Sequence, residues 1–265
     1  MNRIDARFAD LRRQEKKAFV VYIGAGDPNL EATRKFAVAF DRAGVDVLEL
    51  GVPFSDPLAD GLVNQLAAQR GLAAGTTPDK LLETVAAIRR DAQIPIVLYI
   101  YFNLIHKVGL EFFIKAAAAA GVDGLLVLDL PPEESGAYEA LMAKHGLRQI
   151  YLIAPTTPEA RVAAIVQRAA GFIYYISRAG VTGMQQQIAS DLAEQVAKIR
   201  QHTELPIVVG FGISNPEQAQ TVARAADGCV VGSAIVNQIA QLGSSPDGAT
   251  RITDFVRAMV EAVKR

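Results

Sequence analysis

The sequence has few of the residues whose abundance would define a special class of protein. Its 265 residues include one cysteine, three histidines and no tryptophan. A single cysteine, Cys229, excludes an internal disulfide and is typical of proteins from a reducing compartment. His106, His145 and His202 stand apart, on expected helices or their ends, without the spacing of a metal site. We therefore expect neither a disulfide-bonded fold nor a bound metal.

An excess of charge of one sign is also missing. With 27 basic and 28 acidic residues the net charge is −1, which does not favour binding to nucleic acid or a membrane surface. No apolar run approaches the roughly 20 residues that span a membrane. Residues 1–15 are charged and helix-like, unlike the apolar centre of a signal peptide. These absences predict a soluble, cytoplasmic protein.

Hydrophobic residues make up 51% of the chain, and short apolar runs alternate with longer helical patterns throughout. After an amphipathic helix at 1–14, strands are predicted at 19–23, 45–50, 95–101, 122–130, 149–154, 171–176, 206–211 and 228–231. Helices are predicted after nearly every strand, at 30–43, 78–91, 110–120, 133–145, 158–169, 190–201, 216–225 and 249–263. The strands are continuous apolar runs, as expected when helices cover the sheet.

Eight strand–helix units in series predict an α/β fold of the (β/α)8 TIM-barrel type. We expect an N-terminal helix before the barrel and a short extra helix at 234–238 before the last helix. A doubly wound open sheet is the alternative, but the eight similar units and the lack of an early Gly-x-Gly-x-x-Gly turn weigh against it. Since no linker divides the chain, residues 1–265 are predicted to form one domain.

The most informative stretch is residues 48–61, where an apolar strand runs into an acidic, proline-containing loop. Glu49 lies inside the apolar run, where a carboxyl group is costly unless it is paired or used. Asp60 follows on the loop. Because the active site of a TIM barrel lies at the carboxyl ends of its strands, the two acids are expected to point at one place. Chance clustering of acids in a surface loop is the alternative.

The loops after the last three strands, at 177–183, 210–214 and 232–234, are small, rich in glycine and carry hydroxyl groups. Glycine exposes backbone N–H groups that hold a phosphate, and the positive end of a following helix adds to this. Any one of these glycines could simply end a strand. Three such loops in consecutive units predict a phosphorylated small substrate.

Four stretches, 48–61, 177–183, 210–214 and 232–236, together resemble the tryptophan synthase alpha chain family, and the likeness runs nearly end to end. The resemblance implies retro-aldol cleavage of indole-3-glycerol phosphate to indole and glyceraldehyde 3-phosphate, without a cofactor. It also implies an α2β2 complex with a beta chain. In the family's pattern Glu49 carries protons, Asp60 stabilises the protonated indole, and Tyr174 lies beside them.

The resemblance also assigns roles to the residues around these three. The phosphate-binding positions are Gly183, Phe211, Gly212, Gly232 and Ser233. The substrate pocket comprises Tyr22, Asn64, Tyr99, Tyr101, Leu126 and Leu128. Arg178 and Thr182 belong to a loop that closes over the site. The residues that face the beta chain are Pro53, Asp56, Pro57, Asn103 and Pro131.

The sequence departs from the family's pattern where the indole ring would lie. Asn64 and Tyr99 stand where apolar residues are usual, Val97 and Leu128 are bulkier than usual, and Tyr22 replaces a frequent phenylalanine. These changes predict a smaller or more polar ring pocket. Two alternatives therefore stay open: a related barrel lyase that cleaves another phosphorylated aldol, and a weakly catalytic subunit that mainly binds and activates a beta chain.

Overall fold

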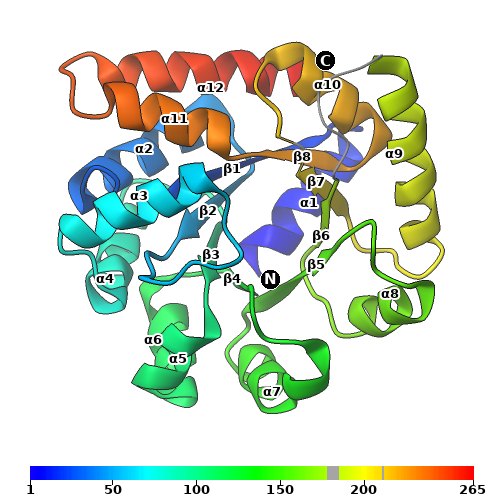
Figure 1. The fold of residues 1–265 in the computed structure, drawn as a ribbon, viewed down its shortest axis with the longest axis horizontal. Helices are drawn as coiled ribbons and strands as arrows, with labels where there is room; N and C mark the ends of the chain where they lie inside the picture. Colours follow the sequence, from blue (N-terminus) through cyan, green and yellow to red (C-terminus); the bar gives the residue numbers. More distant parts are fainter. Residues whose placement is uncertain (178–184, 211) are drawn as a thin grey trace.

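A closed barrel of eight parallel strands forms the centre of the computed structural model, with helices packed around it (Figure 1). The structure describes residues 1–177, 185–210 and 212–265, and for residues 185–190 the helical backbone only. Each strand pairs with the next along the chain, and the last strand closes the ring on the first. The predicted TIM barrel is confirmed.

The strands coincide with the eight predicted apolar runs, although most of their ends shift by a few residues. They are β1 (Ala18–Gly24), β2 (Val47–Gly51), β3 (Ile96–Ile100), β4 (Gly124–Val127), β5 (Arg148–Ile153), β6 (Ile173–Ile176), β7 (Ile207–Gly210) and β8 (Gly228–Val231). Nearly every strand residue is buried, because the helices cover the outside of the sheet and side chains fill its inside.

The helices agree with the prediction in most places. They are α1 (Arg3–Arg13), α2 (Leu30–Ala43), α3 (Leu62–Ala73), α4 (Pro78–Ile88), α5 (Phe102–Val108), α6 (Leu110–Ala120), η1 (Pro132–Glu134), α7 (Gly136–Lys144), α8 (Glu159–Val166), α9 (Gln185–Arg200), α10 (Pro216–Ala225), α11 (Ser233–Leu242) and α12 (Gly248–Lys264). Two of them, α3 and α5, were not predicted. The extra helix α11 starts where expected but is longer than predicted, since it continues to Leu242.

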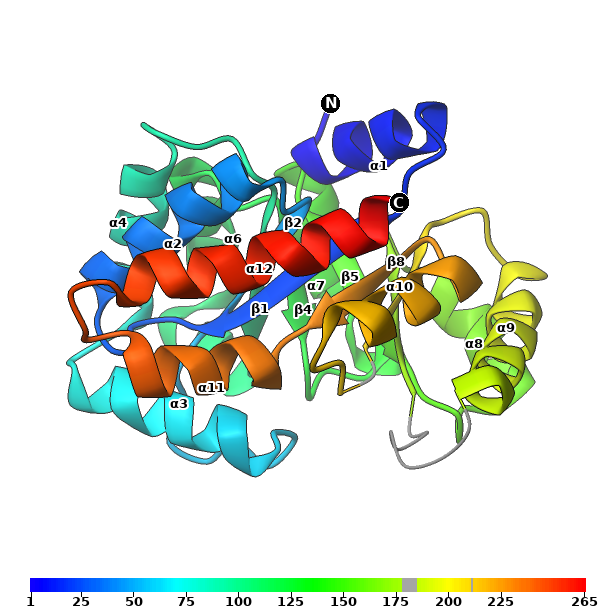
Figure 2. The ribbon, with the colours of Figure 1, turned by 90° about the horizontal axis from the view of Figure 1, so that it is seen from above.

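Two separate hydrophobic clusters build the barrel. The outer cluster packs the outward faces of the strands against the surrounding helices, and the buried Cys229 belongs to it as a small core residue. The inner cluster fills the barrel itself. Ile4, Phe8 and Leu11 of α1 belong to it and close one end of the barrel. Figure 2 shows α1 lying across one end of the barrel, close to the C-terminus.

Buried ion pairs secure the end of the barrel that α1 covers. The buried Asp123 accepts hydrogen bonds from Arg89, the C-cap of α4, at 2.7 Å and from the backbone N–H of Ile96 at 2.8 Å, and it also pairs with Arg3 of α1. These bonds fix the amino ends of the strands. The opposite end, where the strands stop and loops begin, is left for the site.

Among the residues that the structure describes, no helix is both long and apolar enough to cross a membrane.

Candidate active site

The carboxyl ends of the strands bring most of the predicted pocket residues into one layer inside the barrel. The parallel register places Glu49 of β2 between Tyr22 of β1 and Val97 of β3. Two residues further along the strands, Tyr99 of β3 lies between Gly51 of β2 and Leu126 of β4. The inner cluster also includes the predicted residues Tyr22, Tyr99, Leu126, Leu128 and Tyr174. The expectation that these side chains meet at one end of the barrel therefore agrees with the geometry.

Two glycines make room for the phenol groups in this layer. A Cβ atom at Gly51 would lie 2.3 Å from the hydroxyl of Tyr22, and one at Gly210 would lie 2.6 Å from the hydroxyl of Tyr174. Any larger residue at either position would push the neighbouring ring out of place. Sequence reasoning did not single out Gly51, and it treated Gly210 only as part of a glycine-rich loop. The missing side chains of both glycines leave the space that the two rings occupy, and this sets the shape of the pocket.

Glu49 is fully buried at the centre of this layer. Neither of its carboxyl oxygens accepts a hydrogen bond from any residue that the structure describes. Because burial penalises the charged form, the pKa of Glu49 rises to about 8. Burial and then the charge of Glu49 raise the pKa of Tyr174 well above its usual value. Glu49 can therefore hold a proton near neutral pH and release it with little cost.

Asp60 lies on the loop between β2 and α3 and has the opposite environment. The Tyr99 hydroxyl donates to its Oδ1 at 3.1 Å, and the Tyr101 hydroxyl donates to its Oδ2 at 2.8 Å. Tyr101 also accepts a hydrogen bond from the backbone N–H of Ala59 at 3.0 Å, and Gln65 donates to the carbonyl oxygen of Asp60 at 2.8 Å. The chain's own side chains thus hold this carboxylate in place over β3.

Tyr22 connects the two acids. Its ring meets the ring of Tyr99 edge to face, with centroids 5.0 Å apart. Burial raises the pKa of Tyr22 well above its usual value, and the charges of Asp60 and then Glu49 raise it further. Tyr22 is also the register partner of Glu49, and the Tyr99 hydroxyl binds Asp60, so both acids adjoin this pair of rings. The predicted convergence of the two acids on one pocket is consistent with this geometry.

Asn64 lies on α3, and its side-chain oxygen is buried without a hydrogen-bond partner among the described residues. It stands one turn before Ala67, which packs against Gly24 of β1 and belongs to the inner cluster. A buried amide without a partner is costly, so its oxygen is available to a polar group of a ligand.

The predicted phosphate-binding residues are described in part. Gly232 caps the N-terminus of α11, Ser233 is its first residue, and a Cβ atom at Gly232 would lie 3.4 Å from Tyr22. Gly212 has a left-handed backbone with φ of +60° and open space around it. Arg178, Thr182, Gly183 and Phe211 lie outside the described residues. The described part thus places a helix N-terminus beside the pocket, as an anion site requires.

The residues predicted to face a partner differ in exposure. Asp56 and Asn103 are exposed, and Pro57 and Pro131 are half-buried. Pro53 is buried, because it packs against Gly71 of α3, so it cannot contact a partner directly. Sequence reasoning missed the apolar residues beyond Leu58 on this face: Leu62 and Leu66 of α3 are both exposed.

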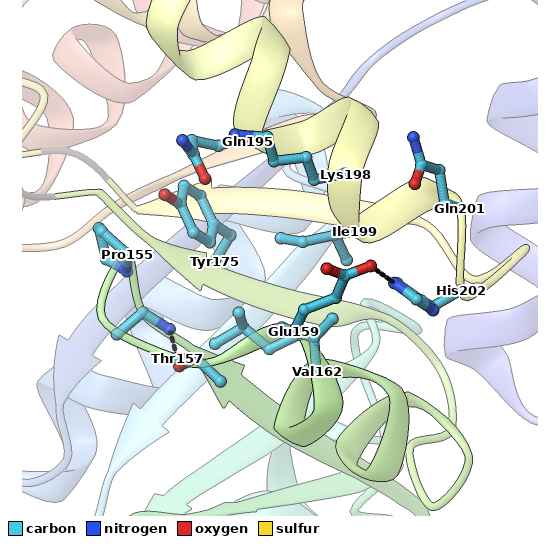
Figure 3. Close-up of a pocket in the computed structure, with 12 residues that line it drawn as sticks. Pro155, Thr157, Glu159, Val162, Tyr175, Gln195, Lys198, Ile199, Gln201 and His202 are labelled. Atoms are coloured by element: carbon cyan, nitrogen blue, oxygen red, sulfur yellow. Dashed lines mark hydrogen bonds and ion pairs between the residues drawn. The ribbon is translucent and has the colours of Figure 1, made fainter.

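A separate cavity of about 360 Å³ lies outside the barrel, between α8 and α9 (Figure 3). Outward-facing Tyr175 and Ile199 line it, and His202 pairs with Glu159 across it at 3.5 Å. Its lining includes Ala154, Pro155 and Thr157 of the loop after β5, and it contains none of the predicted site residues. Across the described ranges, no three His, Cys, Asp or Glu side chains gather in a group that could hold a metal ion.

The fold and the pocket at the strand ends define a class of protein: a TIM barrel with two carboxyl groups, those of Glu49 and Asp60, at the carboxyl ends of its strands. A sequence model of the family "Tryptophan synthase alpha chain" matches residues 8–264. The chain is 52% identical to the alpha chain of Opitutus terrae over all of both chains, and 49% identical to that of Geotalea daltonii over 98% of each.

Solved structures give the same result. The tryptophan synthase alpha subunit of Legionella pneumophila matches with a TM-score of 0.91 and 38% identity, over 99% of this chain and 98% of that one. Tryptophan synthase from M. tuberculosis, in its aminoacrylate-bound form, matches with a TM-score of 0.88 and 29% identity, over 100% of each chain. The chain therefore belongs to the tryptophan synthase alpha chain family, and it is a lyase of tryptophan biosynthesis.

The burial of Glu49 predicts a pH dependence of stability. Its folded-state pKa of about 8 lies above the ordinary value of 4.5, so the folded protein keeps a proton that the unfolded chain loses between these values. Wild-type stability should therefore fall as pH rises from 4.5 to 8, by up to about 5 kcal/mol from this group, and then level off. Glu49→Gln should lack this component in urea unfolding measured from pH 4.5 to 9.

The exposed Glu261 of α12 offers a matched control, since Glu261→Gln removes a carboxyl group from the surface. Its pH profile should follow that of the wild type. Parallel profiles for Glu49→Gln and the wild type would show that Glu49 does not hold a proton in the folded state.

Proposed function

We propose that the chain cleaves indole-3-glycerol phosphate to indole and glyceraldehyde 3-phosphate by a retro-aldol reaction. The observation that carries this proposal is the pairing of two carboxyl groups with opposite environments around one pocket. Glu49 is buried without a described partner, whereas Asp60 is held by two phenols. Such a difference in environment suits two different roles, proton exchange for one carboxyl group and stabilisation of a cation for the other.

In the proposed mechanism Glu49 moves the protons. The reaction needs a proton on the indole carbon that carries the glycerol chain, and it needs the neighbouring hydroxyl to lose its proton. The carbon–carbon bond then breaks, its electron pair returns to the indole ring, and the hydroxyl carbon becomes the aldehyde. A carboxyl group with a pKa of about 8 is available in both protonation states near neutral pH.

Asp60 stabilises the charge that forms in the ring. Protonation of the ring carbon puts positive charge on the indole nitrogen, and a carboxylate that accepts the N–H hydrogen bond lowers the energy of this state. Each oxygen of Asp60 already accepts one phenol hydrogen bond, and each has a further lone pair for the indole N–H. We assign Tyr174 of β6, which packs against the inner cluster, to the same pocket.

The phosphate of the substrate is assigned to the N-terminus of α11 and the loops beside it. The backbone N–H groups that begin α11 after Gly232 are not all used within the helix, and the helix dipole favours an anion there. Gly212, Gly183 and Phe211 belong to the same proposed site. Tyr22, which contacts both Gly232 and the acid-bearing layer, links the two halves of the pocket.

A specific observation also supports a second candidate, a lyase that acts on another phosphorylated aldol. The amide oxygen of Asn64 on α3 is buried without a described partner, and several phenols line the pocket; both features suit a substrate more polar than an indole ring. Direct comparison of indole-3-glycerol phosphate with simple phosphorylated aldols separates the two. The third possibility, a weakly catalytic subunit, has less support because both acids are well placed.

We propose that a beta chain covers the face next to Asp60, in an α2β2 complex in the cytoplasm. Leu58, Leu62 and Leu66 are 84%, 68% and 43% exposed, and they surround the start of α3 beside the catalytic loop. Exposed leucines close together are typical of a protein interface. Asp56, Pro57, Asn103 and Pro131 border the same mouth of the barrel, so indole released there would enter the partner directly.

The proposed roles of the acids predict the effect of removing them. Glu49→Gln and Asp60→Asn should each reduce indole release from indole-3-glycerol phosphate by about 10² to 10⁴, because each loses positioned acid–base or electrostatic help. Both variants should keep the wild-type circular dichroism spectrum. Glu261→Gln serves as the control and should keep full activity. Wild-type turnover in either folded acid variant would refute its role.

The proposed phosphate site gives a second prediction. Ser233→Asp places a negative charge at the start of α11, so binding of inorganic phosphate or glyceraldehyde 3-phosphate should weaken by roughly tenfold or more. The control Ser245→Asp adds the same charge beyond the other end of α11 and should have little effect. Isothermal calorimetry measures both. Unchanged affinity in Ser233→Asp would place the phosphate elsewhere.

A further inference from the structure

We infer that the hydroxyl group of Tyr99 is a positioning group that fixes the Asp60 carboxylate in the orientation needed for the reaction. This inference rests on the proposed role of Asp60. Sequence reasoning treated Tyr99 only as a wall of the ring pocket that makes it smaller or more polar. The structure adds a direct bond between its hydroxyl and the carboxylate.

The two phenols bind different oxygens of the same carboxylate. Tyr99 donates to Oδ1 at 3.1 Å and Tyr101 donates to Oδ2 at 2.8 Å. A single donor leaves a carboxyl group free to turn about its terminal bond, because that torsion is broad. Two donors on two oxygens fix the plane of the group and therefore the direction of its remaining lone pairs.

Tyr99 is well suited to this task because it is itself held on a rigid element. It lies on β3, in the middle of the barrel, and its carbonyl oxygen accepts the backbone N–H of Val52 at 2.9 Å. Its ring packs edge to face against Tyr22 at 5.0 Å, which restricts its rotation. Asp60, by contrast, lies on a loop. A strand residue thus sets the orientation of a loop residue, as precise sites require.

The environment also keeps Tyr99 in the donor form. Burial and then the charge of Asp60 raise the pKa of Tyr99 well above its usual value, so the phenol stays protonated at working pH. The other titratable groups that act on Tyr99 are the phenols of Tyr22 and Tyr174. No competing charge among these groups draws the hydroxyl away from Asp60.

The variant Tyr99→Phe tests the inference because it removes the hydroxyl and keeps the ring. We expect kcat/KM for indole release to fall roughly 10- to 100-fold, as for a hydrogen bond to a charged group. Affinity for indole should weaken, whereas affinity for glyceraldehyde 3-phosphate, which does not reach Asp60, should stay unchanged. Tyr138→Phe is the control: it removes the buried hydroxyl of a tyrosine on α7, outside the pocket.

Indole affinity is easily followed because the chain contains no tryptophan, so fluorescence of an indole group arises from the ligand alone. Four proteins form a double-mutant cycle: wild type, Tyr99→Phe, Asp60→Asn and the double variant. If Tyr99 acts through Asp60, the loss in indole affinity caused by Tyr99→Phe should disappear in the Asp60→Asn background. A purely structural effect of Tyr99 would persist in both backgrounds.

Three outcomes would overturn the inference. Unchanged kcat/KM in Tyr99→Phe would show that the hydroxyl has no role. The same loss of indole affinity with and without Asp60 would show that it acts independently of the carboxylate. If either result occurs while Asp60→Asn remains inactive, the proposed function stands and only the inference fails. Full activity of Asp60→Asn would refute the role of Asp60 and the inference with it.

Discussion

The site depends on one costly feature, the burial of the Glu49 carboxyl group in the middle of the barrel. The surrounding strands exclude water and provide no described hydrogen-bond partner, so the group prefers its neutral form. Gly51 and Gly210 allow Tyr22 and Tyr174 to close around it. The well-packed barrel below, sealed by α1, supplies the stability that such a group reduces.

Asp60 complements this buried acid from the rim of the pocket. Its loop leads directly into α3, whose exposed leucines form the proposed contact with a beta chain. A partner bound there would touch the same segment that carries the carboxylate, so docking would be physically connected with the proposed catalysis. Tyr99 and Tyr101 already hold the carboxylate from within the chain. A bound partner would therefore need to restrict the Asp60 carboxylate less than if the loop alone held it.

The sequence predicted the parts of the structure that depend on local pattern. Continuous apolar runs located all eight strands, and residues in or just after them, such as Glu49 and Gly232, indicated where the candidate site lies. The pattern failed for α3, whose apolar residues do not gather on one face, and for α5, which has only seven residues. It also failed where contacts join distant segments: the bonds to Asp60 from Tyr99 and Tyr101, and the burial of Pro53 against Gly71, depend on strand register and helix packing.

The most direct test of the account is the release of indole from indole-3-glycerol phosphate by the purified chain, measured alone and with a beta chain. We predict measurable release by the chain alone and faster release in the complex. Equal amounts of glyceraldehyde 3-phosphate should form, as the retro-aldol reaction requires. If no indole appears even with a bound beta chain, the pocket around Glu49 and Asp60 serves a different substrate and the proposed function is wrong.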